Sequence, residues 1–209
     1  MDSERPEALE DRVAAELGGA GWAVARAFLE PELVSALAGE ARALRERGAL
    51  RGARIGRGAG RVQRPEIRGD AICWIEPALA SPSQRLLLAR FESLRLALNR
   101  ALHLGLFGLE AHFSVYPPRA CYQRHSDCFR GASQRVVSCV AYLNQGWQAG
   151  DGGALRLHVG RERSVDVAPL GGTLVAFLSE RFEHEVLPAA RERLSVAAWF
   201  RRRAEMVCR

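Results

Sequence analysis

Residues 173–200, TLVAFLSERFEHEVLPAARERLSVAAWF, carry the pattern that decides the fold. Three short β-prone runs lie in this stretch, and charged or turn-forming residues separate them: TLVAFL, HEVL and LSVAAWF. Similar runs lie upstream, with glycine and proline turns between them: HFSVY, CYQRH, VVSCVAYL and ALRLHV. Seven or eight short strands of this kind predict a β-sandwich or a double-sheet jelly roll over residues 112–202.

The first half of the chain has the spacing of helices. Apolar residues recur every three or four positions from Leu9 to the Gly18-Gly19 pair, from Pro31 to Leu44, and from Ser83 to Leu102. This period predicts three helices, and two further runs predict strands, WAVARAFL (22–29) and ICWIEP (72–77).

We therefore predict an α+β, mainly β fold: a double-stranded β-helix (jelly roll, cupin-like) buttressed by N-terminal helices. We expect a single domain over residues 1–209, in which residues 1–105 supply helical support plus a mobile loop at 50–66, and residues 112–202 form the jelly-roll core.

Positive charge is concentrated before the predicted core. Residues 42–68 contain nine arginines against Glu46 and Glu66, and all 30 basic residues of the chain are arginine. The glycine-rich part of this segment, residues 50–66, predicts a mobile loop. Two interpretations stay open: a solvated surface loop, or a lid that meets an anionic substrate surface.

Composition excludes several classes of protein. No apolar run has transmembrane length, and the acidic start MDSERPEALEDR is not typical of a secretory signal. The five cysteines have no CxxC spacing, which argues against a disulfide framework or a zinc knuckle. We expect a cytoplasmic protein with no membrane partner.

Two histidines and one aspartate are the candidate metal ligands. His125-Ser126-Asp127 follows a predicted strand, and His184 opens another. An isolated His-x-Asp or His-x-Glu has about even odds of arising by chance in a chain of this composition. In combination, however, two imidazoles and one carboxylate at the mouth of a β-barrel match the facial triad of non-haem Fe(II) sites. His112 and His158 have no such companions, and we interpret them as ordinary strand histidines.

A facial triad leaves coordination positions open for a 2-oxo acid and then O2. A dicarboxylate co-substrate also needs an anchor for its far carboxylate, and a guanidinium suits that role because it is permanently charged and forked. Arg193 lies on the predicted strand after His184, and Ser195, two residues later, faces the same way. The sequence therefore predicts iron ligands and a 2-oxoglutarate anchor close together.

Five segments carry a resemblance to a known family: IRGDAICWIE (67–76), VYPPRACYQRHSD (115–127), VAYLNQGW (140–147), DGGALRL (151–157) and FLSERFEHEVLPAARERLSVAAWF (177–200). The chain resembles the Fe(II)/2-oxoglutarate-dependent prolyl 4-hydroxylases of the oxygen-sensing type (hypoxia-inducible-factor prolyl hydroxylase-like), and still more their bacterial relatives. The resemblance runs from about Gly21 to the end of the chain.

This resemblance implies a role for further residues. Besides the iron ligands and Arg193, Tyr142 would hydrogen-bond the distal carboxylate of 2-oxoglutarate. Tyr116 would line the pocket near the iron, and Trp199 would lie on the substrate side. An ion pair between Asp70 and Arg135 would tie the mobile loop to the barrel.

The resemblance also implies the activity: hydroxylation of a prolyl residue in a protein loop, with release of succinate and CO2. Fe(II), 2-oxoglutarate and O2 would be required, with ascorbate as a candidate reductant. In the bacterial relatives the implied partner is elongation factor Tu, and the basic segment 42–68 would favour acidic flanks around the target. Alternatives are an oxygenase of the same fold acting on a free amino acid or small molecule, and a non-catalytic cupin-like binding module. A nucleic-acid-modifying enzyme is a weaker alternative, because no aromatic residues are interleaved with the arginines.

Overall fold

The computed structural model describes residues 8–56, 60, 62–128 and 134–203. Its helices are α1 (Leu9–Ala20), α2 (Pro31–Glu46) and α3 (Pro82–Leu102), with short 3-10 turns η2 (Pro77–Leu79) and η3 (Ala149–Asp151). Its strands are β1 (Trp22–Ala25), β2 (Arg51–Gly52), β3 (Ala71–Trp74), β4 (Gly108–Tyr116), β5 (Tyr122–His125), β6 (Arg135–Tyr142), β7 (Leu155–His158), β8 (Ser164–Val167), β9 (Leu174–Leu178), β10 (His184–Val186) and β11 (Arg193–Arg201).

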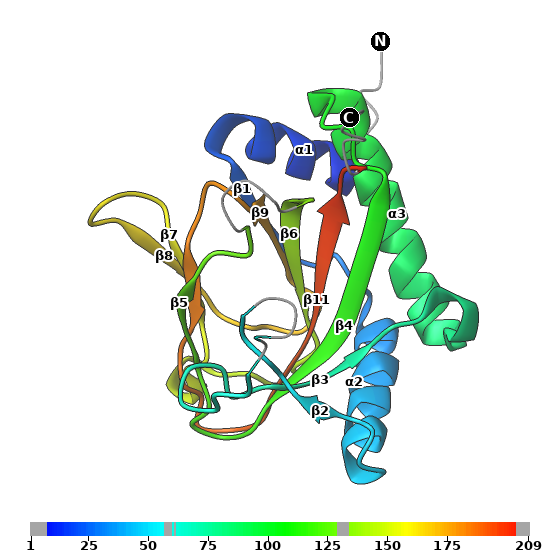
Figure 1. Ribbon diagram of the computed structural model, residues 1–209. Coiled ribbons are helices and arrows are strands. Elements are labelled where there is room, and N and C mark those ends of the chain that lie inside the picture. The colour runs from blue at the N-terminus through cyan, green and yellow to red at the C-terminus, as the bar shows by residue number, and fades with distance from the viewer. Residues whose placement is uncertain (1–7, 57–59, 61, 129–133, 204–209) are drawn as a thin grey trace.

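Two antiparallel sheets form the β part of the fold. The major sheet has the strand order β1-β9-β6-β11-β4-β3-β2, and the minor sheet has the order β5-β10-β7-β8. Figure 1 shows the minor sheet on one side of the major sheet and the helices on the other. This arrangement confirms the predicted jelly roll buttressed by N-terminal helices.

Side chains alternate along each strand, so one face of the major sheet packs against the helices and the other lines a cavity. On β11, Val196, Ala198 and Phe200 are buried in the apolar core that the sheet shares with the helices. The intervening residues, among them Ser195 and Trp199, line a cavity on the opposite face. Because successive side chains of a strand point to opposite faces, one strand supplies both the core and the candidate site.

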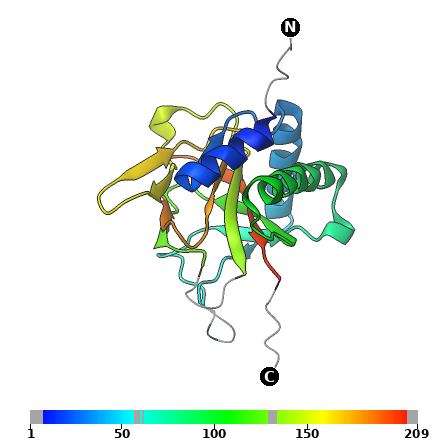
Figure 2. The same ribbon diagram turned by 90° about the horizontal axis from the view of Figure 1, so that it is seen from above.

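Helices α2 and α3 close the apolar face of the major sheet. Figure 2 shows them beside that sheet, on the side away from β7 and β8. Helix α3 buries Leu87, Phe91 and Leu94, and the Phe91 ring lies edge-on to Phe200 of β11, with the centroids 6.3 Å apart. Helix α2 begins at Pro31, a favourable first-turn position. Among the described helices, none is both long and apolar enough to cross a membrane.

Two helix ends differ from the prediction. Helix α1 continues past Gly18-Gly19 and ends at Ala20, before Gly21, which takes the left-handed conformation at φ 86°. A Cβ at Gly18 would lie 2.7 Å from Leu102 of α3, so this glycine permits close helix packing and does not end the helix. Helix α3 begins at Pro82, one residue before the predicted Ser83.

The strand prediction missed two elements. Strand β8 is a half-exposed edge strand with an alternating exposure pattern, and β2 is only two residues long. Neither contains the apolar run by which strands are recognised from sequence. Strand β2 lies in the segment predicted to be a mobile loop, residues 50–66, and pairs with β3. Residues 57–59 and 61 of that segment lie outside the described residues, and its mobility stays a prediction.

Candidate active site

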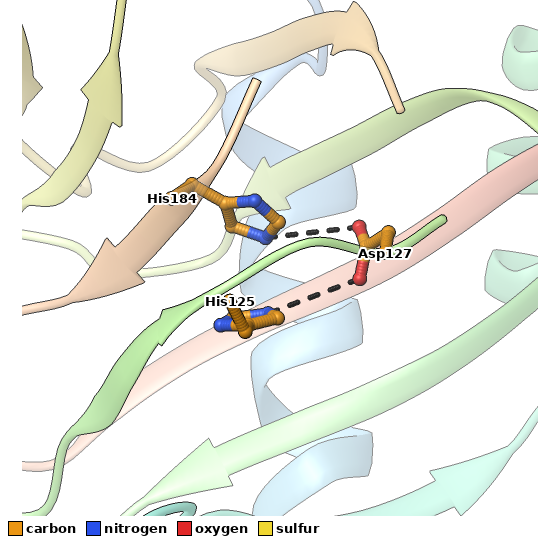
Figure 3. Close-up of side chains that lie close together, drawn as sticks. All are labelled: His125, Asp127 and His184. Atoms are coloured by element: carbon orange, nitrogen blue, oxygen red, sulfur yellow. Dashed lines mark ion pairs between the residues drawn. The ribbon is translucent and has the colours of Figure 1, made fainter. Parts of the chain in front are cut away.

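His125, Asp127 and His184 meet between the two sheets (Figure 3). His125 ends β5 and His184 begins β10, and these residues are directly opposite each other in the antiparallel pair. Asp127 follows two residues after His125. Its Oδ1 lies 3.8 Å from His125 Nε2, and its Oδ2 lies 3.7 Å from His184 Nε2. One ligand atom from each residue lies within 4.8 Å of the others, so the three can share one metal ion.

Hydrogen bonds orient two of these candidate ligands. His125 Nδ1 lies 2.8 Å from the Gln123 carbonyl oxygen. A carbonyl can only accept, so Nδ1 carries the proton and Nε2 has a free lone pair for a metal. Asp127 Oδ2 accepts hydrogen bonds from Ser138 Oγ at 2.7 Å and from Trp199 Nε1 at 2.8 Å. These bonds hold the carboxylate with Oδ1 unencumbered.

The protonation states of the three residues suit cation binding. Burial, together with the nearby His184, lowers the pKa of His125 to about 3. Burial also lowers the pKa of His184. Burial alone would raise the pKa of Asp127, but the two imidazoles and the hydrogen bonds from Trp199 and Ser138 outweigh it and lower the pKa to about 2. At neutral pH the cluster therefore offers two neutral imidazoles and one carboxylate.

Arg193 is a buried cation without a carboxylate partner among the described residues. Its side chain is 1 % exposed, and it lines the same inner cavity as the three candidate ligands. Its Nε donates to the Gly153 carbonyl oxygen at 2.9 Å, and Nη1 lies 3.4 Å from Ser195 Oγ. Nη2 is buried and makes no hydrogen bond within the described part of the chain. An unpaired buried guanidinium is costly, so the site suits an anionic ligand.

Two tyrosines flank this guanidinium. The ring centroids of Tyr116 and Tyr142 lie 5.3 Å and 5.1 Å from Arg193 Cζ. Tyr116 lines the inner cavity, whereas Tyr142 is completely buried, and its hydroxyl has no hydrogen-bond partner among the described residues. The unpartnered Tyr142 hydroxyl and Arg193 Nη2 fit the distal carboxylate of a bound 2-oxoglutarate, which would accept from both.

Gly153 makes room for Arg193. It has φ +70°, and a Cβ there would lie 2.9 Å from Ala189 Cβ and 3.4 Å from Arg193 Cδ. Its carbonyl holds the guanidinium. The DGGALRL segment therefore has a structural role in the candidate anchor that its composition alone did not reveal.

An outer cleft of about 1510 Å³ opens next to the inner cavity. Six residues line both spaces: Arg68, His112, Tyr122, His125, Asp127 and Trp199. The His112 ring lies edge-on to Trp74 at 4.9 Å and tilted against Trp199 at 5.3 Å. The boundary between the candidate metal ligands and the cleft is thus aromatic, and Trp199, which was predicted to lie on the substrate side, is part of this boundary.

The expected ion pair between Asp70 and Arg135 is wrong. Asp70 pairs instead with Arg68, whose Nε lies 2.7 Å from Oδ1, and it accepts a hydrogen bond from Ser114 Oγ at 2.7 Å. Arg135 pairs with Glu110 at 2.6 Å and lies over the Trp199 ring.

Strand register explains this difference. Ser114 is opposite Ser195 of β11, and Arg135 is opposite Arg201, six residues further along the same strand. At about 3.3 Å per residue, the two positions are separated by about 20 Å. The segment before β3 is held to the barrel by other contacts, which include Asp70 with Ser114 and the guanidinium of Arg68 over the Tyr122 ring at 4.8 Å.

Three site residues were missed or underrated from sequence: Ser138, Gly153 and His112. The sequence around Ser138 does not predict its hydrogen bond to Asp127, because that bond depends on how the strands pair. His112 was interpreted as an ordinary strand histidine, and its Nδ1 does bond to the Phe113 carbonyl oxygen at 3.0 Å. Its position between the inner cavity and the outer cleft depends on the fold. His158 pairs with Glu185 at 3.1 Å, away from the candidate ligands.

Comparisons with known proteins agree with this geometry. The model of the 2OG-Fe(II) oxygenase superfamily matches residues 111–201, a range that contains all three candidate ligands and Arg193. A prolyl-4-hydroxylase from Pseudomonas putida has a crystal structure 46 % identical in sequence, with a TM-score of 0.85; the match covers 93 % of this chain and 100 % of that chain.

Two animal proteins are also similar. A Trichoplax adhaerens prolyl hydroxylase, solved in complex with a peptide of the oxygen degradation domain of hypoxia inducible factor, is 26 % identical with a TM-score of 0.82, over 92 % of this chain and 89 % of that one. The hypoxia-inducible factor prolyl hydroxylase of Caenorhabditis elegans is 27 % identical over 94 % of this chain. The chain spans only 29 % of the length of that relative.

The family uses Fe(II), 2-oxoglutarate and O2, and the buried residues described above fit those groups. The structural match to a prolyl-4-hydroxylase covers nearly the whole chain, and the family model matches the strands that carry the candidate ligands. We conclude that the chain belongs to the 2OG-Fe(II) oxygenase superfamily, among its prolyl hydroxylase homologues.

Proposed function

We propose that the chain is a prolyl 4-hydroxylase that acts on a protein substrate and converts 2-oxoglutarate and O2 to succinate and CO2. One observation carries the proposal: the buried Arg193, without a carboxylate partner among the described residues, lines the same cavity as a two-histidine, one-carboxylate cluster. A non-catalytic binding module has no need for that pair of features side by side.

Each residue has a proposed task. His125, Asp127 and His184 bind Fe(II), which when bound supplies the oxidation of a substrate C–H bond by O2. Arg193, with Tyr142 and Ser195, fixes the far carboxylate of 2-oxoglutarate. Tyr116 borders the same cavity, and Trp199 holds Asp127 through its indole N–H.

In this scheme, no acid-base pair is required among the other residues that line the inner cavity. The chain's contribution is to orient the two co-substrates and to exclude water from a site lined largely by buried side chains. Ascorbate is the proposed reductant that keeps the iron in the Fe(II) state. A cytoplasmic location stays a prediction.

A peptide segment is the proposed substrate. The outer cleft is open and leads to Trp199 and the iron ligands, which suits a loop of a folded protein better than an enclosed small molecule. The Trichoplax relative was solved with a peptide fragment bound, which supports the same class of substrate. Elongation factor Tu is the candidate protein, on the basis of the resemblance to bacterial relatives.

The first test measures the co-substrates without any assumption about the protein substrate. Fe(II) and 2-oxoglutarate binding is measured anaerobically, air is admitted, and succinate is quantified for the native chain and for His184→Ala. We expect succinate from the native chain and none from the variant. Arg12→Ala is the control, because Arg12 is exposed on α1 and lines neither the inner cavity nor the outer cleft.

The second step identifies the product. Elongation factor Tu and its proline-containing peptides are incubated with the enzyme, and mass spectrometry locates an added oxygen atom on a prolyl residue. If succinate forms but no protein or peptide gains oxygen while a free amino acid does, the alternative small-molecule oxygenase is correct. If the native chain binds neither Fe(II) nor 2-oxoglutarate, the enzyme assignment fails.

A further inference from the structure

The outer cleft has a second feature that the iron site does not explain: one of its walls extends along the edge of the major sheet. In the pairing of β2 with β3, Arg51 is opposite Ile72, and two residues further along β3 Trp74 is opposite His112 of β4. Directly paired residues point to the same face of a sheet, and residues two apart on a strand do so as well. Arg51 therefore projects from the same face as Trp74 and His112.

This wall combines an exposed indole with cationic side chains. Trp74 is 45 % exposed, although its ring contacts His112 and lies 6.3 Å from the Trp199 ring. Arg51 and Arg54 are exposed, line the cleft, and make no ion pair among the described residues. The aromatic surface next to the proposed iron ligands is thus bordered, farther out in the cleft, by the positive charges of Arg51 and Arg54.

The balance of charge over the cleft is positive. Six arginines line it, against two carboxylates, Glu110 and Asp127. Asp127 is the proposed iron ligand, and Glu110 is already shared by Arg135 and Arg201. Both acidic residues of the lining therefore have other roles, and Arg51 and Arg54 have no acidic partner among the described residues.

We propose that the outer cleft selects prolyl segments with acidic flanking residues, and that Arg51 and Arg54 determine this preference. The inference rests on the proposed prolyl hydroxylation and adds the charge of its substrate. The target proline lies against the Trp74–Trp199 surface, and a flanking aspartate or glutamate contacts Arg51 and Arg54. Nucleic acid is the less favoured occupant, since single-strand binding uses a series of aromatic platforms along a basic groove.

The test uses a peptide library with a central proline and flanks of Asp/Glu, of the neutral isosteres Asn/Gln, or of Arg. Binding to the Fe(II)- and 2-oxoglutarate-loaded chain is measured anaerobically by fluorescence anisotropy. Oxygen incorporation is then measured in air by mass spectrometry. An exposed arginine–carboxylate contact changes the affinity by up to about five-fold, so two contacts give a preference for acidic flanks of up to about twenty-five-fold. Higher salt reduces that preference.

Charge reversal locates the effect. Arg51→Glu combined with Arg54→Glu abolishes the preference for acidic flanks or reverses it toward the Arg-flanked peptides. Arg12→Glu, on the exposed face of α1, changes the net charge by the same amount as Arg54→Glu alone and leaves the preference unchanged. Arg54→Glu alone, which alters no residue of a strand, gives part of the effect. Stabilisation of each variant by 2-oxoglutarate confirms that it is folded.

The outcomes separate the two proposals. Equal binding of acidic and neutral peptides, a double variant that keeps the native preference, or an oligonucleotide that binds more tightly than the acidic peptides overturns the charge inference. Hydroxylation of prolyl peptides regardless of their flanks leaves the proposed function intact and removes only this inference. Tight, charge-selective binding without oxygen incorporation supports the inference and counts against prolyl hydroxylation.

Discussion

Replacing Tyr142 by phenylalanine tests the proposed 2-oxoglutarate anchor, because the empty and the loaded protein should respond in opposite directions. The Tyr142 hydroxyl is completely buried and has no hydrogen-bond partner among the described residues. Burial raises its pKa to about 12, so it is a neutral donor at every usable pH. Removing an unsatisfied hydroxyl relieves a desolvation cost, and we expect Tyr142→Phe to raise the unfolding free energy of the empty protein by about 1 kcal/mol.

The loaded protein should lose affinity for 2-oxoglutarate. A hydrogen bond to a charged group contributes about 1.5–3 kcal/mol, so the Kd for 2-oxoglutarate should rise about ten- to hundred-fold. At a concentration one hundred times the native Kd, 2-oxoglutarate stabilises the native chain by about 2.7 kcal/mol, and the variant by about 1.4 kcal/mol or less.

Calorimetric titration and chemical denaturation, with and without 2-oxoglutarate, measure both effects. Phe107→Leu is the control, because Phe107 is exposed and lines neither the inner cavity nor the outer cleft. An unchanged Kd for Tyr142→Phe would falsify the assignment of Tyr142 to the anchor. A variant that is less stable than the native chain when empty would instead mean that the hydroxyl has a partner within the protein.

Three further predictions follow from the site. Gly153→Ala should lower the unfolding free energy by about 1–3 kcal/mol in thermal denaturation, because a Cβ at φ +70° would lie 2.9 Å from Ala189 Cβ; unchanged stability would show that this loop yields easily. Ser138→Ala should weaken Fe(II) binding about ten- to hundred-fold in anaerobic titrations, because Asp127 loses one of its orienting hydrogen bonds, and an unaltered metal affinity would contradict that role. Burial lowers the pKa of His112 to about 4, below its ordinary value of 6.5, so the unfolded chain takes up this proton first and stability falls as the pH drops from 6.5 toward 4. Between pH 7 and pH 5 the loss from His112 should be about 2 kcal/mol in urea denaturation, and a His112→Leu variant with the same pH dependence as the native chain would refute it.

The position of the candidate active site follows from the way in which the two sheets supply its side chains. The minor sheet supplies His125 and His184 as a directly paired couple, and the major sheet supplies Arg193 and Trp199 from the cavity face of one strand. The opposite face of that strand is fixed by packing against the helices. A small shift of β11 would therefore disturb the core and the site together, which favours a rigid placement of the anchor.

Local sequence patterns were sufficient to predict much of the fold. The β-prone runs of 112–200 became strands because short β-branched and aromatic segments between turns have few other ways to bury their apolar side chains. The helix starting at Pro31 was predicted correctly for a local reason as well, since proline suits the first turn. Strand β8 escaped prediction because a half-exposed edge strand needs no apolar run.

The candidate site, too, has features that the sequence predicted and features that it could not predict. The sequence by itself determined which residue types were available and in what spacing: His125 and Asp127 two apart, Arg193 and Ser195 two apart on a strand, and His184 at the start of another. Period-two alternation is a local property, so it places such pairs on one face without knowledge of the rest of the chain.

Only the tertiary structure decided which distant groups are partners. It paired Asp70 with Arg68 and Ser114, brought Ser138 to Asp127, and left Arg193 buried without a carboxylate among the described residues. These relations depend on the register between strands that are far apart in the chain. A shift of one residue in that register would turn each side chain to the other face, and no local pattern encodes it.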